Sequence, residues 1–239
     1  MITNLSVNIN KVALIRNARG ENLPNLVQVA KDCEAFGAAG ITVHPRPDQR
    51  HIRYDDIPKL KKIVTTELNI EGNPIPNFMD LVLTNLPHQC TLVPDKPQAL
   101  TSTSGWDTIE NAAFLTEVIA EMQKAGIRVS LFVNPETKFI EGAKKVGADR
   151  IELYTGIFAK SFHTSKRAEE MAKHTACSQL AHELGLEVNA GHDLDLQNLR
   201  YYKQNMPYLD EVSIGHALIS NALYDGLEST IKQYIELLK

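Results

Sequence analysis

Histidine and glutamate side chains recur at the ends of short apolar runs in this sequence. Imidazole titrates near neutral pH, and a carboxyl group in a dry site can have its pKa raised toward neutrality, so both suit acid–base catalysis. Any one of these residues could be an ordinary structural side chain, but several at corresponding places favour a shared site. The residues are His44, Glu71, Glu152, His192 and His216.

The same side chains could also bind a metal ion, because histidine and carboxylate ligands suit zinc or iron. The sequence contains no H-x-H or H-x-x-H pair that would favour such a site. Cys33, Cys90 and Cys177 are far apart and odd in number, and they predict neither a thiolate metal site nor a disulfide framework. We therefore expect acid–base catalysis without a metal ion.

Two groups of residues predict anion binding. Segment 214–217 ends an apolar run and opens a helix, where free backbone N–H groups and the helix dipole favour a phosphate; segment 189–192 forms a partner turn. The second group is cationic, and arginine grips phosphate with two parallel hydrogen bonds. Two pockets would suit one bisphosphorylated substrate or two phosphorylated substrates. The cationic residues are Arg16, Arg19, Arg46, Arg50 and His51.

Short strands separated by helices must position these residues. Four times a helical stretch ends at a glycine, which suits a left-handed cap, and is followed by a β-branched run typical of a buried parallel strand. These segments are 36–44, 125–132, 146–154 and 184–191. Further strands are expected near 5–10, 68–71, 88–93 and 210–214, and helices over 107–125, 164–184 and 216–237.

Eight strands alternating with helices predict a parallel sheet covered by helices. A doubly wound open sheet usually has a glycine-rich turn after its first strand, and this sequence has none. The 239 residues match the size of a (β/α)8 barrel. We therefore predict an α/β fold, a single (β/α)8 TIM barrel over residues 1–239 with parallel strands and extended active-site loops. Segment 94–106, long and rich in small polar residues, is either an active-site lid or an ordinary surface loop.

Composition excludes several classes of protein. The net charge of -4 argues against a general nucleic-acid binder, which would carry a basic face. No apolar run approaches the roughly 20 residues needed to span a bilayer, and no secretory signal is visible at the N-terminus. We expect a cytoplasmic protein that acts without nucleic acid or membrane.

The sequence resembles the pyridoxine 5′-phosphate synthase family over essentially its full length. The resemblance implies a barrel enzyme of vitamin B6 biosynthesis that condenses 1-deoxy-D-xylulose 5-phosphate with 3-amino-2-oxopropyl phosphate and releases inorganic phosphate and water. It also implies a homo-oligomer, often an octamer, without an organic cofactor. The segments that together carry the resemblance are 7–9, 16–20, 40–44, 50–52, 69–71, 92–94, 189–192 and 214–217.

The resemblance also implies roles for individual residues. His44 and Glu71 correspond to proton acceptors, His192 to a proton donor, and Glu152 to a transition-state stabiliser. The residues that match the amino-ketone phosphate site are Asn8, Arg19, Gly191, Gly215 and His216. Those that match the deoxyxylulose phosphate site are Arg46, His51 and Thr101.

One departure from the family concerns Asn10 and Lys11, which stand where the family commonly has Asp-His in contact with the deoxyxylulose substrate. Asparagine can hydrogen-bond a hydroxyl but cannot act as a base, and lysine brings a permanent charge. We retain both as substrate-binding residues. Two alternatives remain: a lyase or isomerase acting on one phosphosugar, and a non-catalytic barrel that binds phosphorylated metabolites.

Overall fold

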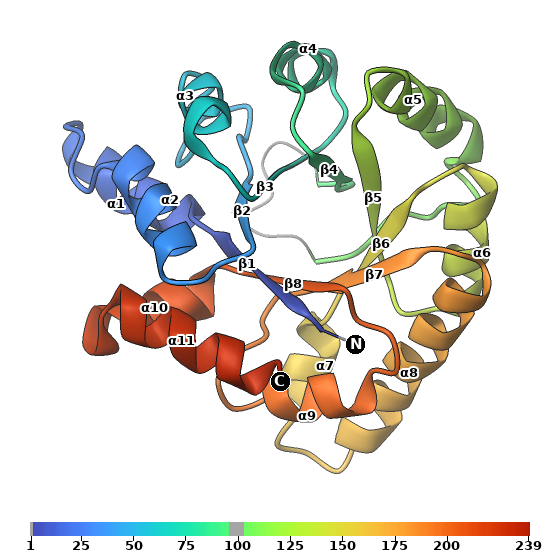
Figure 1. Cartoon of the computed structure of the whole chain (residues 1–239). Coiled ribbons are helices and arrows are strands. Elements are labelled where there is room, and N and C mark those ends of the chain that lie inside the picture. Colours follow the sequence, from blue (N-terminus) through green and yellow to red (C-terminus); the bar gives the residue numbers. More distant parts are fainter. Residues whose placement is uncertain (1, 96–102) are drawn as a thin grey trace.

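Eight parallel strands close into a barrel in the computed structural model of the chain, which describes residues 2–95 and 103–239 (Figure 1). The strands pair in chain order, and β8 pairs with β1. This closure confirms the predicted (β/α)8 fold and excludes the doubly wound sheet. The strands are β1 Asn4–Asn8, β2 Gly40–Val43, β3 Glu67–Gly72, β4 Gln89–Leu92, β5 Arg128–Val133, β6 Arg150–Leu153, β7 Glu187–Ala190 and β8 Glu211–Ile214.

Helices form a ring outside the strands (Figure 1). The helices that the structure describes are α1 Asn10–Arg19, α2 Leu26–Ala35, α3 Asp56–Ile63, α4 Pro76–Asn85, α5 Ala112–Lys124, α6 Thr137–Lys145, α7 Gly156–Ser161, α8 Arg167–Glu183, α9 Leu199–Asn205, α10 His216–Asp225 and α11 Leu227–Leu237. The single helix expected over 216–237 is wrong, because Gly226 adopts a φ of 78° and divides it into α10 and α11. The first strand is also shorter than expected, because Asn10 already begins α1.

The two faces of the barrel wall differ in polarity because side chains alternate along each strand. Val7, Ile41 and Ile70 are fully buried in the apolar core. The alternate positions carry buried polar residues that bond one another inside the barrel: the Ser6 and Thr42 hydroxyls lie 2.7 Å apart. Asn8 lies two residues after Ser6, and His44 lies two residues after Thr42, just beyond the end of β2. The same alternation therefore places the predicted site residues above the barrel interior.

The ends of the strands are set by short turns. At four helix–strand junctions the expected left-handed glycine is present, with φ between 71° and 107° at Gly37, Gly126, Gly147 and Gly185.

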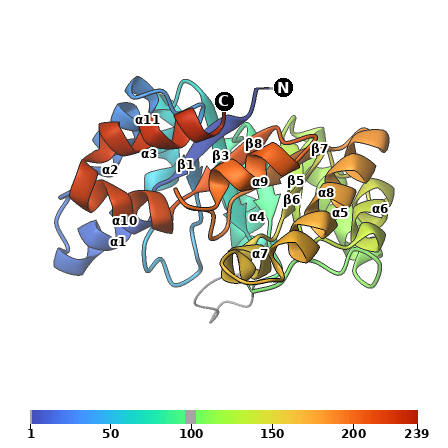
Figure 2. The same cartoon turned by 90° about the horizontal axis from the view of Figure 1, so that it is seen from below.

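Both chain termini lie at one end of the barrel, opposite α7, the short helix that follows β6 (Figure 2). Among the described residues, no helix is both long enough and apolar enough to cross a membrane.

Candidate active site

A cavity of about 670 Å³ lies at the carboxyl ends of the strands, a size typical of small-molecule sites. Twelve of the fourteen predicted site residues line it: Asn8, Asn10, Lys11, His44, Arg46, His51, Glu71, Glu152, Gly191, His192, Gly215 and His216. Arg19 lies at the exposed end of α1 and is not among the lining residues. Thr101 lies outside the described residues. The barrel thus gathers side chains from six strands into one mouth.

His44 and Glu71 face each other across neighbouring strands. His44 follows β2, Glu71 lies in β3, and the His44 Nδ1 is 3.9 Å from the Glu71 Oε2. Burial lowers the pKa of His44 well below its usual value, and the charge of Arg46 lowers it further. Burial raises the pKa of Glu71 well above its usual value, and Glu152 raises it further. Burial therefore favours the uncharged form of both the imidazole and the carboxyl group.

Glu152, in β6, supplies a second protonated carboxyl group. Burial, followed by the nearby charge of Glu211, raises its pKa to about 8, although Arg150 opposes this shift. Its Oε2 is buried and makes no hydrogen bond with any described residue. An uncharged acid with an unbonded oxygen at the base of a cavity can donate a hydrogen bond to a ligand oxygen.

Two asparagines connect β1 to this acid–base pair. The Asn8 Nδ2 donates to the Glu71 Oε2 at 3.4 Å, and the Asn8 Oδ1 accepts from the backbone N–H of Asn10. The Asn10 Oδ1 in turn accepts from the backbone N–H of His44 at 2.9 Å. The side-chain amide of Asn10 therefore fixes the turn that carries His44. This positioning role does not need a titratable group.

Lys11, Arg46 and His51 form a cationic side of the cavity, here called the cationic wall. Burial, followed by the charges of Arg46 and Lys11, lowers the pKa of His51 to about 4, so its ring is neutral. The His51 Nδ1 accepts from the backbone N–H of Ile52 at 2.9 Å, which leaves the proton on Nε2 as a donor. The wall combines permanent cations with a neutral donor, a combination suited to phosphate oxygens.

Arg16, which the sequence grouped with these cations, has a different place in the structure. It is buried and binds the Asp56 carboxylate with both terminal nitrogens, at 2.7 and 2.9 Å. Its Nη2 also donates to the carbonyl oxygen of His51 at 3.1 Å. Arg16 therefore holds the His51 segment in place and does not line the cavity.

The opposite side of the cavity is formed by the turns after β7 and β8. A side chain at position 191 would clash, because an added Cβ would lie 2.0 Å from the Ser213 carbonyl oxygen. Glycine at 191 thus lets the two turns approach closely. Gly215 precedes α10, and the first residues of that helix line the cavity. Its free N–H groups and positive dipole end suit an anion, as predicted from the sequence.

His192 lies at the rim beside a carboxylate. Its Nδ1 is 3.2 Å from the Asp193 Oδ2, and its ring packs edge-on against Tyr154 with centroids 5.4 Å apart. The neighbouring His192 ring, and then the charges of Lys160 and His216, lower the pKa of Asp193. Asp193 has a φ of 65°, a left-handed conformation that aspartate tolerates better than most residues.

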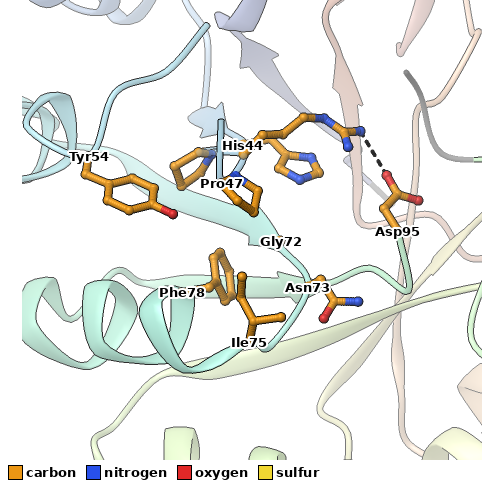
Figure 3. Close-up of a pocket in the computed structure, with 10 residues that line it drawn as sticks. His44, Pro47, Tyr54, Gly72, Asn73, Ile75, Phe78 and Asp95 are labelled. Atoms are coloured by element: carbon orange, nitrogen blue, oxygen red, sulfur yellow. Dashed lines mark hydrogen bonds and ion pairs between the residues drawn. The ribbon is translucent and has the colours of Figure 1, made fainter. Parts of the chain in front are cut away.

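Sequence reasoning missed some lining residues. Lys160 lines the cavity from α7, a six-residue helix hidden in the connection before the predicted helix 164–184. Asp95, which follows β4, pairs with Arg46 and lines a second, smaller cavity next to His44 (Figure 3). No spacing pattern marked either residue. Asp95 lies in a connection, and Lys160 lies in a helix too short to show an apolar period.

The proposed lid, segment 94–106, lies partly outside the described residues. Its far end is fixed in the core. The buried Trp106 donates from Nε1 to the Leu92 carbonyl oxygen at 3.1 Å, and its backbone N–H donates to Phe132. Gly105 N–H donates to the Asn134 side chain. Within the described part of the chain, no group of three or more His, Cys, Asp or Glu side chains is arranged to hold a metal ion.

Comparison with known sequences gives one family. The chain matches the model described as "Pyridoxal phosphate biosynthesis protein PdxJ" over residues 5–239. It is 61% identical over 238 residues to the pyridoxine 5′-phosphate synthase of Cytophaga hutchinsonii, covering 100% of both chains. It is 59% identical over 233 residues to the enzyme of the same name from Bacteroides fragilis, covering 98% of each.

Comparison with solved structures gives the fold alone. The 3-keto-L-gulonate-6-phosphate decarboxylase of Vibrio cholerae superposes with a TM-score of 0.67 at 10% identity, covering 100% of this chain and 98% of that one. Phosphoribosylanthranilate isomerase from Thermotoga maritima gives a TM-score of 0.65 at 11% identity, covering 99% and 98%. Both agree with the closed barrel.

Proposed function

This chain belongs to the PdxJ family of pyridoxal phosphate biosynthesis proteins, and from that premise we propose how its cavity works. The chain is a pyridoxine 5′-phosphate synthase, an enzyme of vitamin B6 biosynthesis. It condenses 1-deoxy-D-xylulose 5-phosphate with 3-amino-2-oxopropyl phosphate to give pyridoxine 5′-phosphate, inorganic phosphate and water.

The reaction consists of proton-transfer steps around the joining of an amine to a ketone. Imine formation, loss of phosphate, loss of water and ring closure each need a proton to be removed or supplied. A site for this chemistry must hold two phosphorylated molecules side by side, which raises their effective concentration. It must also offer several acid–base groups that titrate differently. The 670 Å³ cavity with anion-binding features on two sides meets the first need.

His44 is the proton acceptor in this proposal, because the lowered pKa keeps its imidazole unprotonated. The raised pKa of Glu71 favours its protonated form. The ammonium group of the amino-ketone substrate would bring a positive charge to this carboxyl, which lowers the pKa of a carboxyl group and favours release of its proton. Glu71 can then accept a proton in a later step.

Glu152 acts as an uncharged hydrogen-bond donor that stabilises oxygen atoms as they become negative. Its buried and unbonded Oε2 is the observation that supports this role. His192, paired with Asp193 at the rim, is the proton donor. The Asp193 carboxylate beside the ring orients it.

The two phosphates occupy opposite sides of the cavity. The cationic wall, with Lys11, Arg46 and His51, binds the phosphate of the deoxyxylulose substrate, and Asn10 lies beside it. Gly191, Gly215 and His216, with Asn8 nearby, bind the amino-ketone phosphate at the start of α10. Arg19 and Thr101 are retained as family-based candidates for these two sites.

The main support for this proposal is the buried His44–Glu71 pair, which lines the same cavity as the two anion-binding groups. The test is to incubate purified protein with each substrate alone and with both, and to measure pyridoxine 5′-phosphate and inorganic phosphate. We expect both products only when both substrates are present, in equal amounts. Turnover of one substrate alone would instead indicate a phosphosugar lyase or isomerase. Binding without turnover would indicate a phosphometabolite-binding protein.

The chain also has a surface suited to self-association, and we propose a cytoplasmic homo-oligomer, an octamer by family resemblance, of single-domain chains over residues 1–239. Helices α1 and α10 contact each other, and both carry exposed apolar side chains. On α1, Leu14 and Ile15 are 42% and 47% exposed; on α10, Leu223 and Tyr224 are 71% and 91% exposed. Apolar side chains gathered on two neighbouring helices suit a protein–protein contact, whereas single exposed apolar residues are ordinary.

A further inference from the structure

Arg46 makes an ion pair with Asp95 in the wall between two cavities. The Arg46 Nη2 lies 2.9 Å from the Asp95 Oδ2, and each side chain is only 6% exposed. Arg46 lines the active-site cavity, whereas Asp95 is not among the residues that line it. Both line the enclosed cavity of about 20 Å³ beside Asn73 (Figure 3). The carboxylate therefore contacts the guanidinium from outside the active-site cavity.

The contact leaves most of the guanidinium available. Arginine presents five N–H donors in a rigid plane, and the ion pair with Asp95 uses Nη2. Among the described residues, the Nε and Nη1 of Arg46 make no hydrogen bond with protein. A plane that is fixed at one edge and unbonded at the other can direct two parallel hydrogen bonds at an incoming phosphate.

Burial makes this fixation effective. A buried guanidinium needs a nearby anion, because a buried charge without a partner is strongly destabilising. A long side chain also loses rotamer freedom when it becomes ordered around a ligand. If a carboxylate already orders the side chain in the free protein, this conformational entropy is lost during folding and not during binding. The ligand then binds more tightly.

We propose that Asp95 is a positioning residue for Arg46: it holds the guanidinium in place within the cationic wall and thereby sets the affinity for the phosphate of one substrate. This inference rests on the proposed function, in which Arg46 binds the phosphate of 1-deoxy-D-xylulose 5-phosphate. It predicts an effect on that substrate alone, because the amino-ketone phosphate binds at the opposite side of the cavity.

The test substitutes Asp95→Asn, which keeps the shape of the side chain and removes its charge. We expect the KM for 1-deoxy-D-xylulose 5-phosphate to rise about tenfold, which is about 1.4 kcal/mol. The KM for the amino-ketone phosphate and the kcat at saturation should stay within about twofold. Asp95→Glu restores the charge and should recover part of the affinity. Glu228→Gln is the control, because Glu228 pairs with Lys232 on α11 and does not line the active-site cavity, so this variant should leave both KM values unchanged.

Arg46→Gln separates this proposal from the proposed function. If Arg46→Gln raises the ketose KM and Asp95→Asn raises it too, the double variant should be no worse than Arg46→Gln alone. If Arg46→Gln raises this KM but Asp95→Asn leaves it unchanged or lowers it, the positioning role is overturned and the phosphate site stands. If Arg46→Gln has no effect on KM, the phosphate site itself is wrong, and the positioning role fails with it. Should Asp95→Asn fail to fold, Asp95→Glu provides the same comparison, with a smaller expected rise in KM.

Discussion

The Nδ1 of His44 lies 3.9 Å from the Oε2 of Glu71, and the two side chains are 10% and 13% exposed. Burial moves the two pKa values in opposite directions, because it disfavours the charged form of each group. Both shifts favour the neutral pair, in which the imidazole can accept a proton and the carboxyl group holds one. This arrangement is the centre of the proposed mechanism.

Substituting Glu152→Gln should change how the rate depends on pH. Glu152, whose pKa is raised to about 8 by burial, is uncharged at pH 7 and ionises above pH 8, when it can no longer donate a hydrogen bond. We expect the kcat of the wild-type enzyme to fall above about pH 8. The amide of the variant donates at every pH, so this fall should be absent while the rate at pH 7 stays within about tenfold of wild type.

The control for this measurement is Glu170→Gln. Glu170 is buried on α8, pairs with Lys173 and does not line the cavity, so its variant should keep the alkaline fall of the wild-type enzyme. A profile for Glu152→Gln that retains this fall unchanged would show that another group is responsible.

Replacing Asp193 with asparagine should slow the chemical step. The carboxylate, 3.2 Å from the His192 Nδ1, orients the ring of the proposed donor. Asparagine tolerates the left-handed φ of 65° at this position, so the turn should be kept. We expect kcat to fall about tenfold with little change in either KM, measured by steady-state kinetics. Asp193→Gly, which also fits this backbone, should give the same loss; an unchanged kcat in both variants contradicts the role.

His174 should make the protein less stable in acid. It is fully buried, its Nδ1 lies 3.0 Å from the Tyr202 hydroxyl, and burial lowers its pKa from 6.5 to about 3. Between these values the unfolded chain binds a proton and the folded chain does not, so the free energy of unfolding falls as pH drops from about 6.5 toward 3.

His174→Gln removes this titration and keeps a hydrogen-bonding side chain. Between pH 7 and 5, the free energy of unfolding of the variant should fall by about 2 kcal/mol less than that of the wild type. Urea denaturation at the two pH values measures the difference. An equal fall in both proteins would mean that His174 does not carry this pH dependence.

The exposed apolar side chains of α10 should be needed for assembly. Leu223→Glu places a charge on a face that the proposal buries against another copy of the chain, and charged groups are costly to bury without a partner. We expect sedimentation velocity to show smaller species than the wild type. Ile109→Glu, at a 58% exposed position outside α1 and α10, is the control and should leave the assembly intact. A wild-type protein that is already monomeric contradicts the proposal.

Much of the site could be predicted from the sequence because parallel strands bring their carboxyl ends together. Asn8 and Glu71 lie on β1 and β3, and His44 directly follows β2, so the fold alone fixes their neighbourhood. The ion pairs of Arg16 with Asp56 and of Arg46 with Asp95 could not be predicted. They depend on the path of loops, which no periodic pattern records.

The helices and strands were likewise predicted only in part. Strand positions followed from β-branched runs after glycine, whereas α7 was missed because its six residues are too few to show an apolar period. Lys160 was missed with it. The break at Gly226 was missed because the apolar pattern continues on both sides of it, although the glycine itself is a helix-end signal.

The role of His44 as proton acceptor is tested by product formation in His44→Ala with both substrates at saturation. We expect this variant to bind both phosphorylated substrates with affinities close to those of the wild type. Pyridoxine 5′-phosphate should form at least about 100-fold more slowly, because the proton acceptor is missing. Formation of the product by His44→Ala at a rate near that of the wild type would show that His44 is not the proton acceptor.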